Sequence, residues 1–464
     1  MSAAFEPKIV AYVCNWCTYL GADLAGTNRL EYPPNVRIVR LPCTGRIDFN
    51  LIVKALEIGA DAVLVSGCHP ADCHYTAGNY HARRRWIMFR RLLDTLGIEL
   101  DRIHFTWISA AEGKKWQQVV TEITEKTRQL GPYTAYREIA DRAHLALCEP
   151  EVSDDAEAFE EETAAPVENP PWRKLAALHS ESAAAPQLRA TARRLLEEGS
   201  VQVVIGYGRR RNGGAANPVF ITRPEETERL TWDAGCSANL TAYLTRKEIK
   251  ALGNAAVVVK GCDERALVVL EKEAQVERGS LHVIGMACNG LGDPLAPKCR
   301  KCQVRVPRFA DELIGEARAL PAPSGPPPAD PLAALMALTP GERWAFWKSE
   351  FSRCVKCYAC RQVCPLCYCE RCIADKNRPT TIDTSASLKG NFAWHITRAF
   401  HLAARCIGCG ECTRACPAAI PLGLLNRSLA EAASGEFAYQ PGMDPAAEPV
   451  FGAWSPSDKE DFIQ

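Results

Sequence analysis

Short apolar runs alternate with amphipathic stretches over residues 8–108 of the chain. Apolar residues keep a helical period from Met88 to Leu96, and Gly97 is suited to end that helix. Alternation of strands and helices predicts a doubly wound parallel sheet with helices on both faces. The predicted strands are KIVAYV (8–13), VRIVRL (36–41), AVLVS (62–66) and IHFTWI (103–108).

Two further regions have their own patterns. VQVVI (201–205), AAVVVK (255–260) and LHVIGM (281–286) repeat the strand-and-helix alternation, which predicts a second α/β domain. The stretch TPGE (339–342) has the residues of a capping box with proline at the first helical position. It predicts the start of a Trp-containing helix that leads into cysteine-dense loops.

Two low-complexity stretches separate these regions. Residues 149–171 are acidic and contain prolines, and residues 317–338 begin with a Pro- and Ala-rich run. Both are predicted to be linkers. The fold class is therefore α/β, with a flavodoxin-like first domain, a second α/β domain and an α-rich third domain. The predicted domains are 1–148, 172–316 and 339–440, followed by a tail at 441–464.

Composition narrows the partners and the compartment. Lys+Arg and Asp+Glu number 55 each, and the resulting net charge of zero argues against nucleic acid as a partner. No apolar run approaches the ~20 residues of a membrane span, and the N-terminus lacks a secretory signal pattern, so we expect a cytoplasmic protein. In a reducing cytosol, 22 cysteines with many short, regular spacings are expected to be mainly metal ligands rather than disulfide partners.

Two cysteine runs share the spacing C-x2-C-x2-C-x3-C, and a proline follows each. Bacterial ferredoxins with two 4Fe–4S clusters have this pattern, in which three close thiolates bind one cluster and the fourth binds the other. Cys364 is therefore expected to join the second run and Cys416 the first, and the third domain is expected to be ferredoxin-like. Structural zinc is the alternative. The runs are Cys354, Cys357, Cys360, Cys364 and Cys406, Cys409, Cys412, Cys416.

Three cysteines directly after the first run are surplus to this pattern. Cys367, Cys369 and Cys372 open an insert between the two runs. They would form a partial ligand set completed from another domain, a zinc knot, or a redox-inert group. We favour a further cluster.

The cysteines of the first domain follow predicted strands. The carboxyl ends of parallel strands converge on one crevice, so five thiols are expected at one place, of which four would bind one cluster. His69 and His74 lie among them and are expected to hydrogen bond rather than to act as ligands. The five are Cys14, Cys17, Cys43, Cys68 and Cys73.

These residues carry a family resemblance. CNWCTYLGADLAG (14–26), YPPNVRIVRLPCTGRID (32–48) and GADAVLVSGCHPADCHYTAGNYHARRR (59–85) resemble the iron–sulfur delta subunit of methyl-viologen-reducing hydrogenase, which links hydrogenase to heterodisulfide reductase. The resemblance covers residues 6–132. It implies a 2Fe–2S cluster held by four of the five thiols. It also implies docking on a heterodisulfide-reductase-A-like flavoprotein, the site of electron bifurcation.

The middle domain also has cysteines near predicted strand ends. Four thiols from three loops suit a 4Fe–4S cluster. Cys236 is a reserve ligand, either here or for the set at 367–372. The four are Cys262, Cys288, Cys299 and Cys302.

A Gly- and Arg-rich turn raises the question of a bound flavin. VVIGYGRRRNGG (203–214) combines a strand, a Gly-x-Gly turn, Arg209–Arg211 and the pair Gly213 and Gly214, groups that suit a pyrophosphate. The spacing is not G-x-G-x-x-G, so an Arg cluster docking an acidic surface is an equal alternative. With KGCDERAL (260–267), the region is similar to iron–sulfur flavoproteins of the deazaflavin-hydrogenase beta-subunit type. That resemblance implies FAD.

Three functions follow, in order of preference. The first is an electron-transfer subunit of a multi-subunit oxidoreductase with one 2Fe–2S cluster, two 4Fe–4S clusters and one or two more. It would relay electrons between a heterodisulfide-reductase-A-like flavoprotein and a hydrogenase, formate dehydrogenase or other dehydrogenase. The second is an FAD-containing beta subunit exchanging hydride with a deazaflavin or nicotinamide. The third is a zinc-stapled scaffold. No nucleophile or acid–base motif is present.

Overall fold

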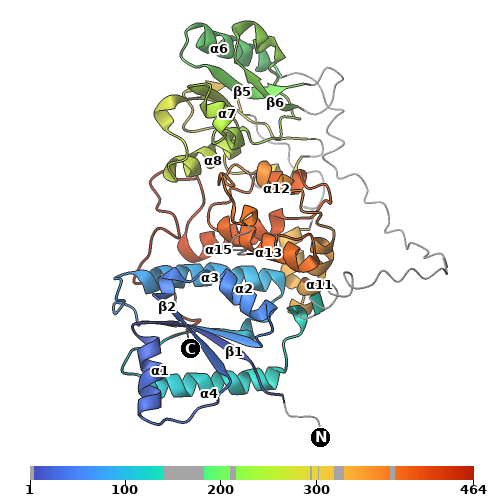
Figure 1. The fold of residues 1–464 in the computed structure, drawn as a ribbon. Coiled ribbons are helices and arrows are strands. Elements are labelled where there is room, and N and C mark those ends of the chain that lie inside the picture. Colours follow the sequence, from blue (N-terminus) through green and yellow to red (C-terminus); the bar gives the residue numbers. More distant parts are fainter. Residues whose placement is uncertain are drawn as a thin grey trace, which may run out of the picture.

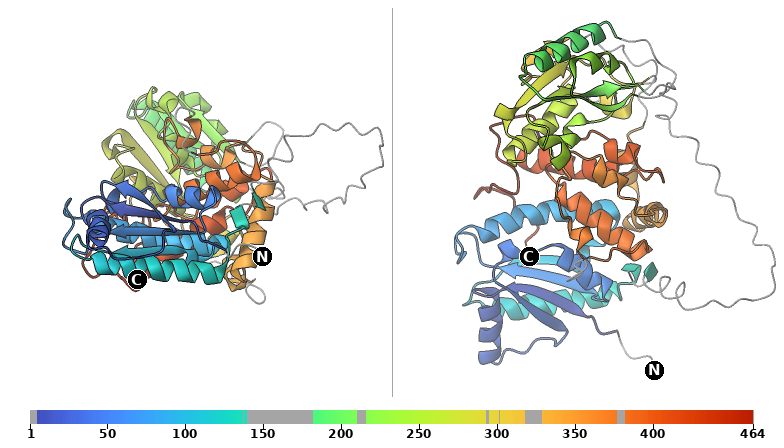
Figure 2. Two further views of the ribbon diagram at one scale, coloured as in Figure 1. Left: turned by 60° about the horizontal axis from the view of Figure 1, so that its bottom comes forward. Right: turned by 45° about the horizontal axis from the view of Figure 1, so that its top comes forward.

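Two α/β domains and a helical, cysteine-rich module make up the protein (Figure 1). The module lies between the two domains in space, although it follows both in sequence, and the views of Figure 2 show the same order. The computed structural model describes residues 5–136, 138–139, 182–209, 216–292, 295–300, 302–317, 329–376 and 382–463.

The N-terminal domain is a four-stranded parallel sheet with strand order β2-β1-β3-β4, which confirms the predicted doubly wound fold. Helices α1 and α4 pack on one face around Trp116, and α2 and α3 pack on the other around Trp86. Gly97 ends α3 in the left-handed conformation, with φ 79°, as expected of a C-cap. The elements are β1 (Ile9–Cys14), α1 (Thr18–Thr27), β2 (Val36–Leu41), α2 (Asn50–Glu57), β3 (Ala62–Gly67), α3 (Gly78–Leu96), β4 (Ile103–Trp107) and α4 (Gly113–Leu130).

The middle domain is a five-stranded mixed sheet with strand order β6-β5-β7-β8-β9. Its three predicted strands are present, and two edge strands were not predicted. β6 is antiparallel to β5 and contains Pro218, a residue that sheets tolerate at an edge. The elements are α6 (Ala185–Glu197), β5 (Val203–Gly208), β6 (Asn217–Ile221), α7 (Lys247–Lys250), β7 (Ala255–Val259), α8 (Gly261–Lys272), β8 (Leu281–Met286), α9 (Pro297–Arg300) and β9 (Glu312–Ile314).

The C-terminal module is helical, and its first long helix starts as predicted. Thr339 and Glu342 form the expected capping box at the start of α11. The linker assigned to 317–338 requires a correction, because Asp330 caps a helix within it that buries Leu332 and Leu335. The helices are α10 (Pro331–Ala337), α11 (Pro340–Ser352), α12 (Ala359–Gln362), α13 (Leu388–His401), α14 (Glu411–Arg414) and α15 (Gly423–Phe437).

The N-terminal domain and the C-terminal module share one hydrophobic core. Helix α3 packs against α11, α13 and α15 of the module. The Trp347 indole donates a hydrogen bond of 2.9 Å to the carbonyl of Thr95, and the Thr95 hydroxyl lies 2.6 Å from that of Ser428. The two units are therefore fixed to each other by buried contacts.

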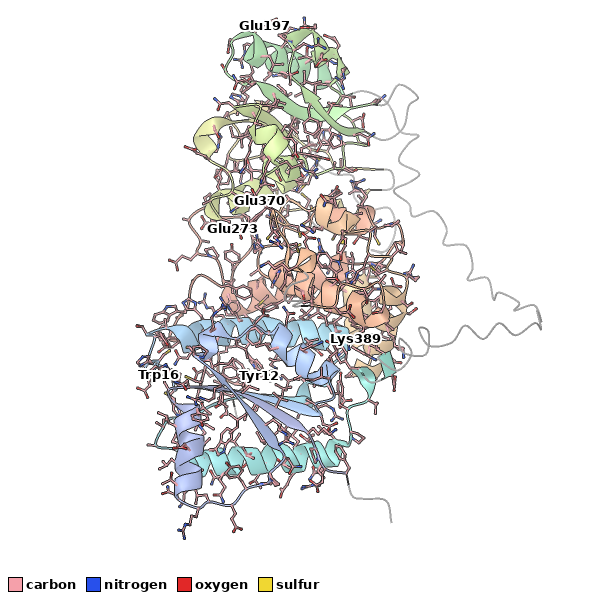
Figure 3. The ribbon with its side chains drawn as sticks, in the orientation of Figure 1. Tyr12, Trp16, Glu197, Glu273, Glu370 and Lys389 are labelled. Atoms are coloured by element: carbon pink, nitrogen blue, oxygen red, sulfur yellow. The ribbon has the colours of Figure 1, made fainter. Side chains whose placement is uncertain are left out.

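The middle domain contacts the other side of the module through α8. Leu270 packs against Leu366 and Leu402 of the module. Glu273 forms an ion pair with Arg405 and accepts a 2.8 Å hydrogen bond from the Tyr368 hydroxyl. Figure 3 shows Glu273 at this junction.

The residues assigned to a tail pack against both domains. The carbonyl of Pro441 accepts hydrogen bonds of 3.0 and 2.9 Å from Arg265 on α8. Further on, Trp454 stacks on Tyr80 of α3 with ring centroids 4.4 Å apart. Asp458 accepts hydrogen bonds of 2.6 and 3.0 Å from Arg84, also on α3. We therefore call residues 441–463 the C-terminal strap.

Within the described residues, none of the helices combines the length and the apolar character required to cross a membrane.

Candidate metal centres

Five thiols meet at the carboxyl end of the N-terminal sheet. Cys14 ends β1, Cys68 follows β3, and β1 and β3 are neighbours on either side of the point where the strand order reverses. Ligands bind at this point in open α/β sheets. Cys43 follows β2, Cys73 lies in the loop after β3, and Cys17 precedes α1. The structure thus brings together all five cysteines proposed for this site.

The thiols form two close pairs. The sulfurs of Cys14 and Cys68 lie 3.6 Å apart, and those of Cys43 and Cys73 lie 3.8 Å apart. Two thiolates on one tetrahedral metal, with metal–sulfur bonds of ~2.3 Å, are separated by ~3.8 Å. In the described chain, no three His, Cys, Asp or Glu side chains gather around one metal ion. Two pairs of thiols fit a two-iron centre better than one zinc ion.

Backbone amides surround the Cys14 sulfur. A hydrogen bond from Cys68 lowers the pKa of Cys14 to about 6, and backbone N–H groups of Trp16, Cys17 and Thr44 also lower it, against the effect of burial. A thiol with such a pKa is largely a thiolate at neutral pH, which is the form that binds metal. The loop is therefore arranged to hold sulfur as an anion.

Helix α3 begins against the second pair of thiols. A Cβ on Gly78 would lie 2.4 Å from the Cys43 sulfur and 3.3 Å from the Cys73 sulfur. The absence of a side chain lets the N-terminus of this 19-residue helix approach the thiols, where its dipole favours negative charge. The Asn79 amide also fixes the turn after β3 by donating to the carbonyl of Cys68, at 3.2 Å.

The two histidines of this region have other contacts. His69 lies 2.7 Å from the Glu112 carboxylate, and His74 stacks on Trp16 with ring centroids 3.9 Å apart. Trp16 and Tyr75 are 41% and 52% exposed. An aromatic surface therefore lies beside the five thiols.

The two cysteine runs of the C-terminal module adopt the same backbone conformation. Lys356 and Tyr358 in the first run have φ of 50° and 56°, and Gly408 and Gly410 occupy the same positions of the second run with φ of 72°. The left-handed region is unfavourable for Lys and Tyr, so the fold must hold them there. The repeated spacing thus corresponds to a repeated three-dimensional loop.

The fourth cysteine of each run lies near the other run. Burial is the main cause of the raised pKa of Cys406, about 12, and Cys412 and Cys364 are close enough to add to the rise. Burial also raises the pKa of Cys354, and Cys416 adds to it. The sulfurs therefore group as the crossed pattern requires.

Arg398 of α13 lies among these thiols. Its side chain is buried, its Nη2 donates a 3.0 Å hydrogen bond to the Cys360 carbonyl, and its Nε has no hydrogen-bond partner. It forms no ion pair with a carboxylate in the described part of the chain. Burial lowers its pKa, but Cys367, Cys412, Cys364 and Cys360 outweigh that effect, and the pKa is raised. A buried cation requires negative charge nearby, and the sulfurs supply it.

The middle-domain cysteines also gather. Cys262 lies at the start of α8, Cys299 lies in α9, and Cys288 and Cys302 lie in the neighbouring loops. Burial raises the pKa of Cys288, to which Cys299 contributes, and it raises that of Cys299, to which Cys302 contributes. Cys236 is a buried thiol that accepts a hydrogen bond from the Asp233 amide, at 3.4 Å.

Two cations connect the middle-domain thiols with the second ferredoxin run. The Lys298 ammonium donates hydrogen bonds to the carbonyls of Ser237, at 3.2 Å, and Cys409, at 3.0 Å. Arg265 has a pKa lowered by burial, and Cys406, Cys262 and Cys302 act on it in the opposite direction. The two thiol groups are therefore neighbours across the domain junction.

The proposed flavin-binding residues lie mostly outside the described residues, which include none of Arg210, Arg211, Gly213 and Gly214. Arg209 is described, and its guanidinium lies 2.7 Å from the buried carboxylate of Asp233. Arg209 thus stabilises its own domain.

Comparison with known proteins identifies the N-terminal region. The family model of the methyl-viologen-reducing hydrogenase delta subunit matches residues 9–131. The iron–sulfur protein VhcD, the D component of the vhc F420-non-reducing hydrogenase of Methanococcus voltae, is 52% identical over 134 residues, which is 29% of this chain and 93% of that protein. The corresponding iron–sulfur component of the F420-non-reducing hydrogenase of Archaeoglobus profundus is 52% identical over 133 residues, 29% of this chain and 97% of that protein.

A second kind of relative contains the same region within a longer chain. The A component of the ferredoxin:CoB-CoM heterodisulfide reductase of Methanosarcina mazei is 40% identical over 126 residues, which is 27% of this chain and 16% of that protein. The predicted family resemblance of the N-terminal domain is therefore confirmed.

Proposed function

Because this chain belongs, through its N-terminal domain, to the family of the delta subunit of methyl-viologen-reducing hydrogenase, we propose that it is an iron–sulfur electron-transfer subunit of a multi-subunit oxidoreductase. Its relatives are iron–sulfur subunits of hydrogenases and a component of a heterodisulfide reductase. The observation that carries the proposal is the grouping of thiols at both ends of the shared core and across the junction with the middle domain.

The N-terminal thiols would hold a 2Fe–2S cluster. Cys14 and Cys68 would bind one iron and Cys43 and Cys73 the other, as supported by the sulfur–sulfur distances of 3.6 and 3.8 Å. Cys17 would then be the fifth, non-ligand thiol. The amides around Cys14 and the N-terminus of α3 stabilise negative charge on the sulfurs, which tunes the potential.

The other thiols would hold three 4Fe–4S clusters, two with crossed ligands in the C-terminal module and one in the middle domain. Iron–sulfur clusters supply one-electron transfer. Arg265 and Lys298 lie between the middle-domain thiols and the second run, which supports electron transfer between these two sites. The protein positions the thiols, excludes water from Cys409 and Cys412, and places the Arg398 cation among them.

The N-terminal domain would dock a heterodisulfide-reductase-A-like flavoprotein, and a hydrogenase or other dehydrogenase would exchange electrons with the rest. Trp16 and Tyr75 are exposed beside the thiols, and edge strand β2 exposes Ile38 and Val39. Exposed apolar groups and an open strand edge are features of interaction surfaces. They lie where an electron would enter or leave the N-terminal centre.

Metal and flavin content test this proposal. The anaerobically purified full chain is analysed for iron, acid-labile sulfide, zinc and flavin, and the dithionite-reduced protein is examined by EPR. We expect at least about 14 iron and 14 sulfide per chain from these four clusters, with signals from reduced 2Fe–2S and 4Fe–4S centres. Zinc without sulfide would contradict the proposal and favour the scaffold. One flavin per chain with NAD(P)H or deazaflavin oxidation would favour the catalytic beta subunit.

A further inference from the structure

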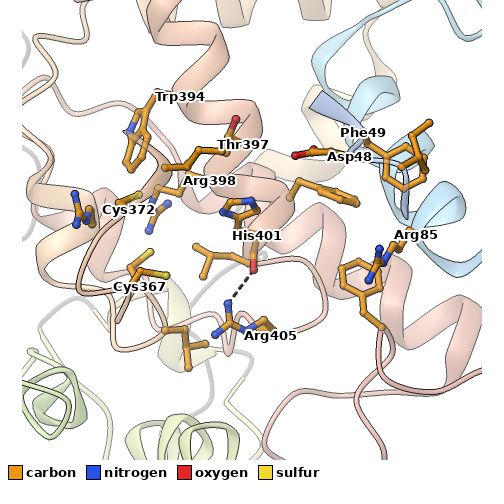
Figure 4. Close-up of a pocket in the computed structure, with 18 of the residues that line it drawn as sticks. Asp48, Phe49, Arg85, Cys367, Cys372, Trp394, Thr397, Arg398, His401 and Arg405 are labelled. Atoms are coloured by element: carbon orange, nitrogen blue, oxygen red, sulfur yellow. Dashed lines mark hydrogen bonds between the residues drawn. The ribbon is translucent and has the colours of Figure 1, made fainter. Parts of the chain in front are cut away.

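A cavity of about 410 Å³ lies where the N-terminal domain meets the C-terminal module. We call it the junction cavity. Figure 4 shows Cys367 and Cys372 on one side and Phe49 and Arg85 on the other, with Arg398 and His401 of α13 between them. Cys369 also lines the cavity.

All three cysteines that are surplus to the two ferredoxin runs therefore face one space. Their spacing is C-x-C-x2-C, and the crossed pattern uses none of them. Resting on the proposed function, we propose that the junction cavity binds an additional cubane iron–sulfur cluster through the thiolates of Cys367, Cys369 and Cys372. Three thiolates leave the fourth corner to a ligand other than cysteine, and the His401 imidazole lines the cavity.

The charge of the lining suits an anionic cluster. Five arginines and one aspartate, Asp48, line the cavity. Arg361 and Arg405 are neutralised by ion pairs with Asp375 and Glu273. Arg85 is different: its Nη1 donates to the Gly45 carbonyl, at 3.2 Å, and no carboxylate in the described part of the chain forms an ion pair with it.

Arg398 is in the same state, because its buried guanidinium is opposed only by thiols. Thiolate-bound clusters are negatively charged, so a cluster in the cavity would compensate both of these cations. Aromatic walls from Phe49 and Trp394 would shield the cluster from water. The lining thus provides thiols, cations and an apolar surround in one place.

The position of the junction cavity adds a function. Cys367 shares a hydrogen bond with Cys364, which belongs to the second ferredoxin cluster in the crossed pattern. On the opposite wall, Arg46 ends the short turn that follows Cys43 of the N-terminal centre. A cluster here would lie between the two redox sites that share the hydrophobic core. It would connect the N-terminal centre with the C-terminal clusters.

The test uses the full chain, isolated anaerobically, with Cys369→Ser and Cys372→Ser combined. Cys369 is exposed and Cys372 half-buried, whereas Cys367 is left intact because it touches Cys364. We expect the variant to lose about four iron and up to four sulfide per chain, out of about 18 iron in the wild type, together with one EPR signal. The signals of the N-terminal and ferredoxin centres should remain.

Cys236→Ser is the matched control, because Cys236 is a buried thiol that does not line the junction cavity. It should retain all the iron. Unchanged iron and unchanged EPR signals in the double variant would overturn the junction cluster alone. A flavin that is released from the wild type and lost from the double variant would also overturn it. A wild-type chain without iron or sulfide would instead contradict the proposed function as a whole.

Discussion

The N-terminal centre and the two ferredoxin runs gather thiols in different ways. In the runs, the spacing of cysteines along the chain places three sulfurs in one loop, and the local backbone conformation repeats at Lys356 and Gly408. In the N-terminal domain, the four paired cysteines are brought together only by the order of parallel strands. The first arrangement is encoded locally, whereas the second requires the whole sheet to form. The two sites should therefore respond differently to substitutions.

The largest expected effect is the loss of the N-terminal centre in Gly78→Ala. The added Cβ would lie 2.4 Å from the Cys43 sulfur, so the helix or the thiol must move. We expect the variant to lose about two iron per chain and the 2Fe–2S EPR signal, while the 4Fe–4S signals remain. Gly26→Ala is the control, since nothing lies within 4 Å of its Cβ. A full 2Fe–2S signal in Gly78→Ala would show that the close approach is not required.

The sequence predicted the locally encoded features and missed the long-range ones. The crossed runs, the Gly97 cap and the capping box at Thr339 depend on a few adjacent residues, and each was readable. The pairing of Cys14 with Cys68 depends on β1 and β3 being neighbours, which periodicity alone does not give. The family resemblance identified the site, but not which sulfurs pair.

Contacts of the C-terminal strap were missed for a related reason. Trp454 and Phe462 are separated by polar residues and have no helical or strand period. Their partners, Tyr80 and Trp86, lie on α3, far away in sequence. Arg398 was also missed, because a single arginine in an amphipathic helix gives no sign of burial among thiols. Only the packed structure shows either feature.

The second prediction concerns Arg398, which has no equivalent among the groups described around the N-terminal thiols. At a separation of ~6 Å and an effective dielectric constant of ~20, one positive charge stabilises a reduced cluster by ~3 kcal/mol, on the order of 100 mV. Arg398→Met should therefore lower the midpoint potentials of the ferredoxin-type clusters by that order. The 2Fe–2S potential should change less. Redox titration followed by EPR measures both.

Arg398→Lys separates charge from shape in this experiment. It retains the cation, so it should restore most of the potential. If Met and Lys variants gave the same potentials as the wild type, the buried guanidinium would have a structural role only.

The third prediction tests how far the N-terminal domain depends on the C-terminal strap. Burial alone would raise the pKa of Asp458, but hydrogen bonds from Arg84 outweigh it and hold the pKa below its usual value. Asp458→Asn should therefore lower the free energy of unfolding by about 2 kcal/mol at neutral pH, as measured by urea denaturation. The exposed Asp461→Asn is the control and should have little effect.

The pH dependence of this difference has a fixed sign. A carboxylate whose folded-state pKa is depressed contributes stability above its unfolded-state pKa of about 3.9. That contribution is lost as pH falls through the lower folded-state pKa. The difference between wild type and Asp458→Asn should therefore shrink in acid. A difference that is constant with pH would mean that the ion pair with Arg84 is not its source.

The smallest expected effect distinguishes the two kinds of site by their surfaces. Trp16 lies between Cys14 and Cys17 and is 41% exposed, and Val355 lies between Cys354 and Cys357 and is 67% exposed. If the N-terminal centre docks the flavoprotein partner, Trp16→Ala should weaken binding about 10-fold, because exposed Trp residues are common anchors of interfaces. Val355→Ala should leave it unchanged. Calorimetric titration with the partner measures both, and equal weakening by the two variants would place the ferredoxin module in the same interface.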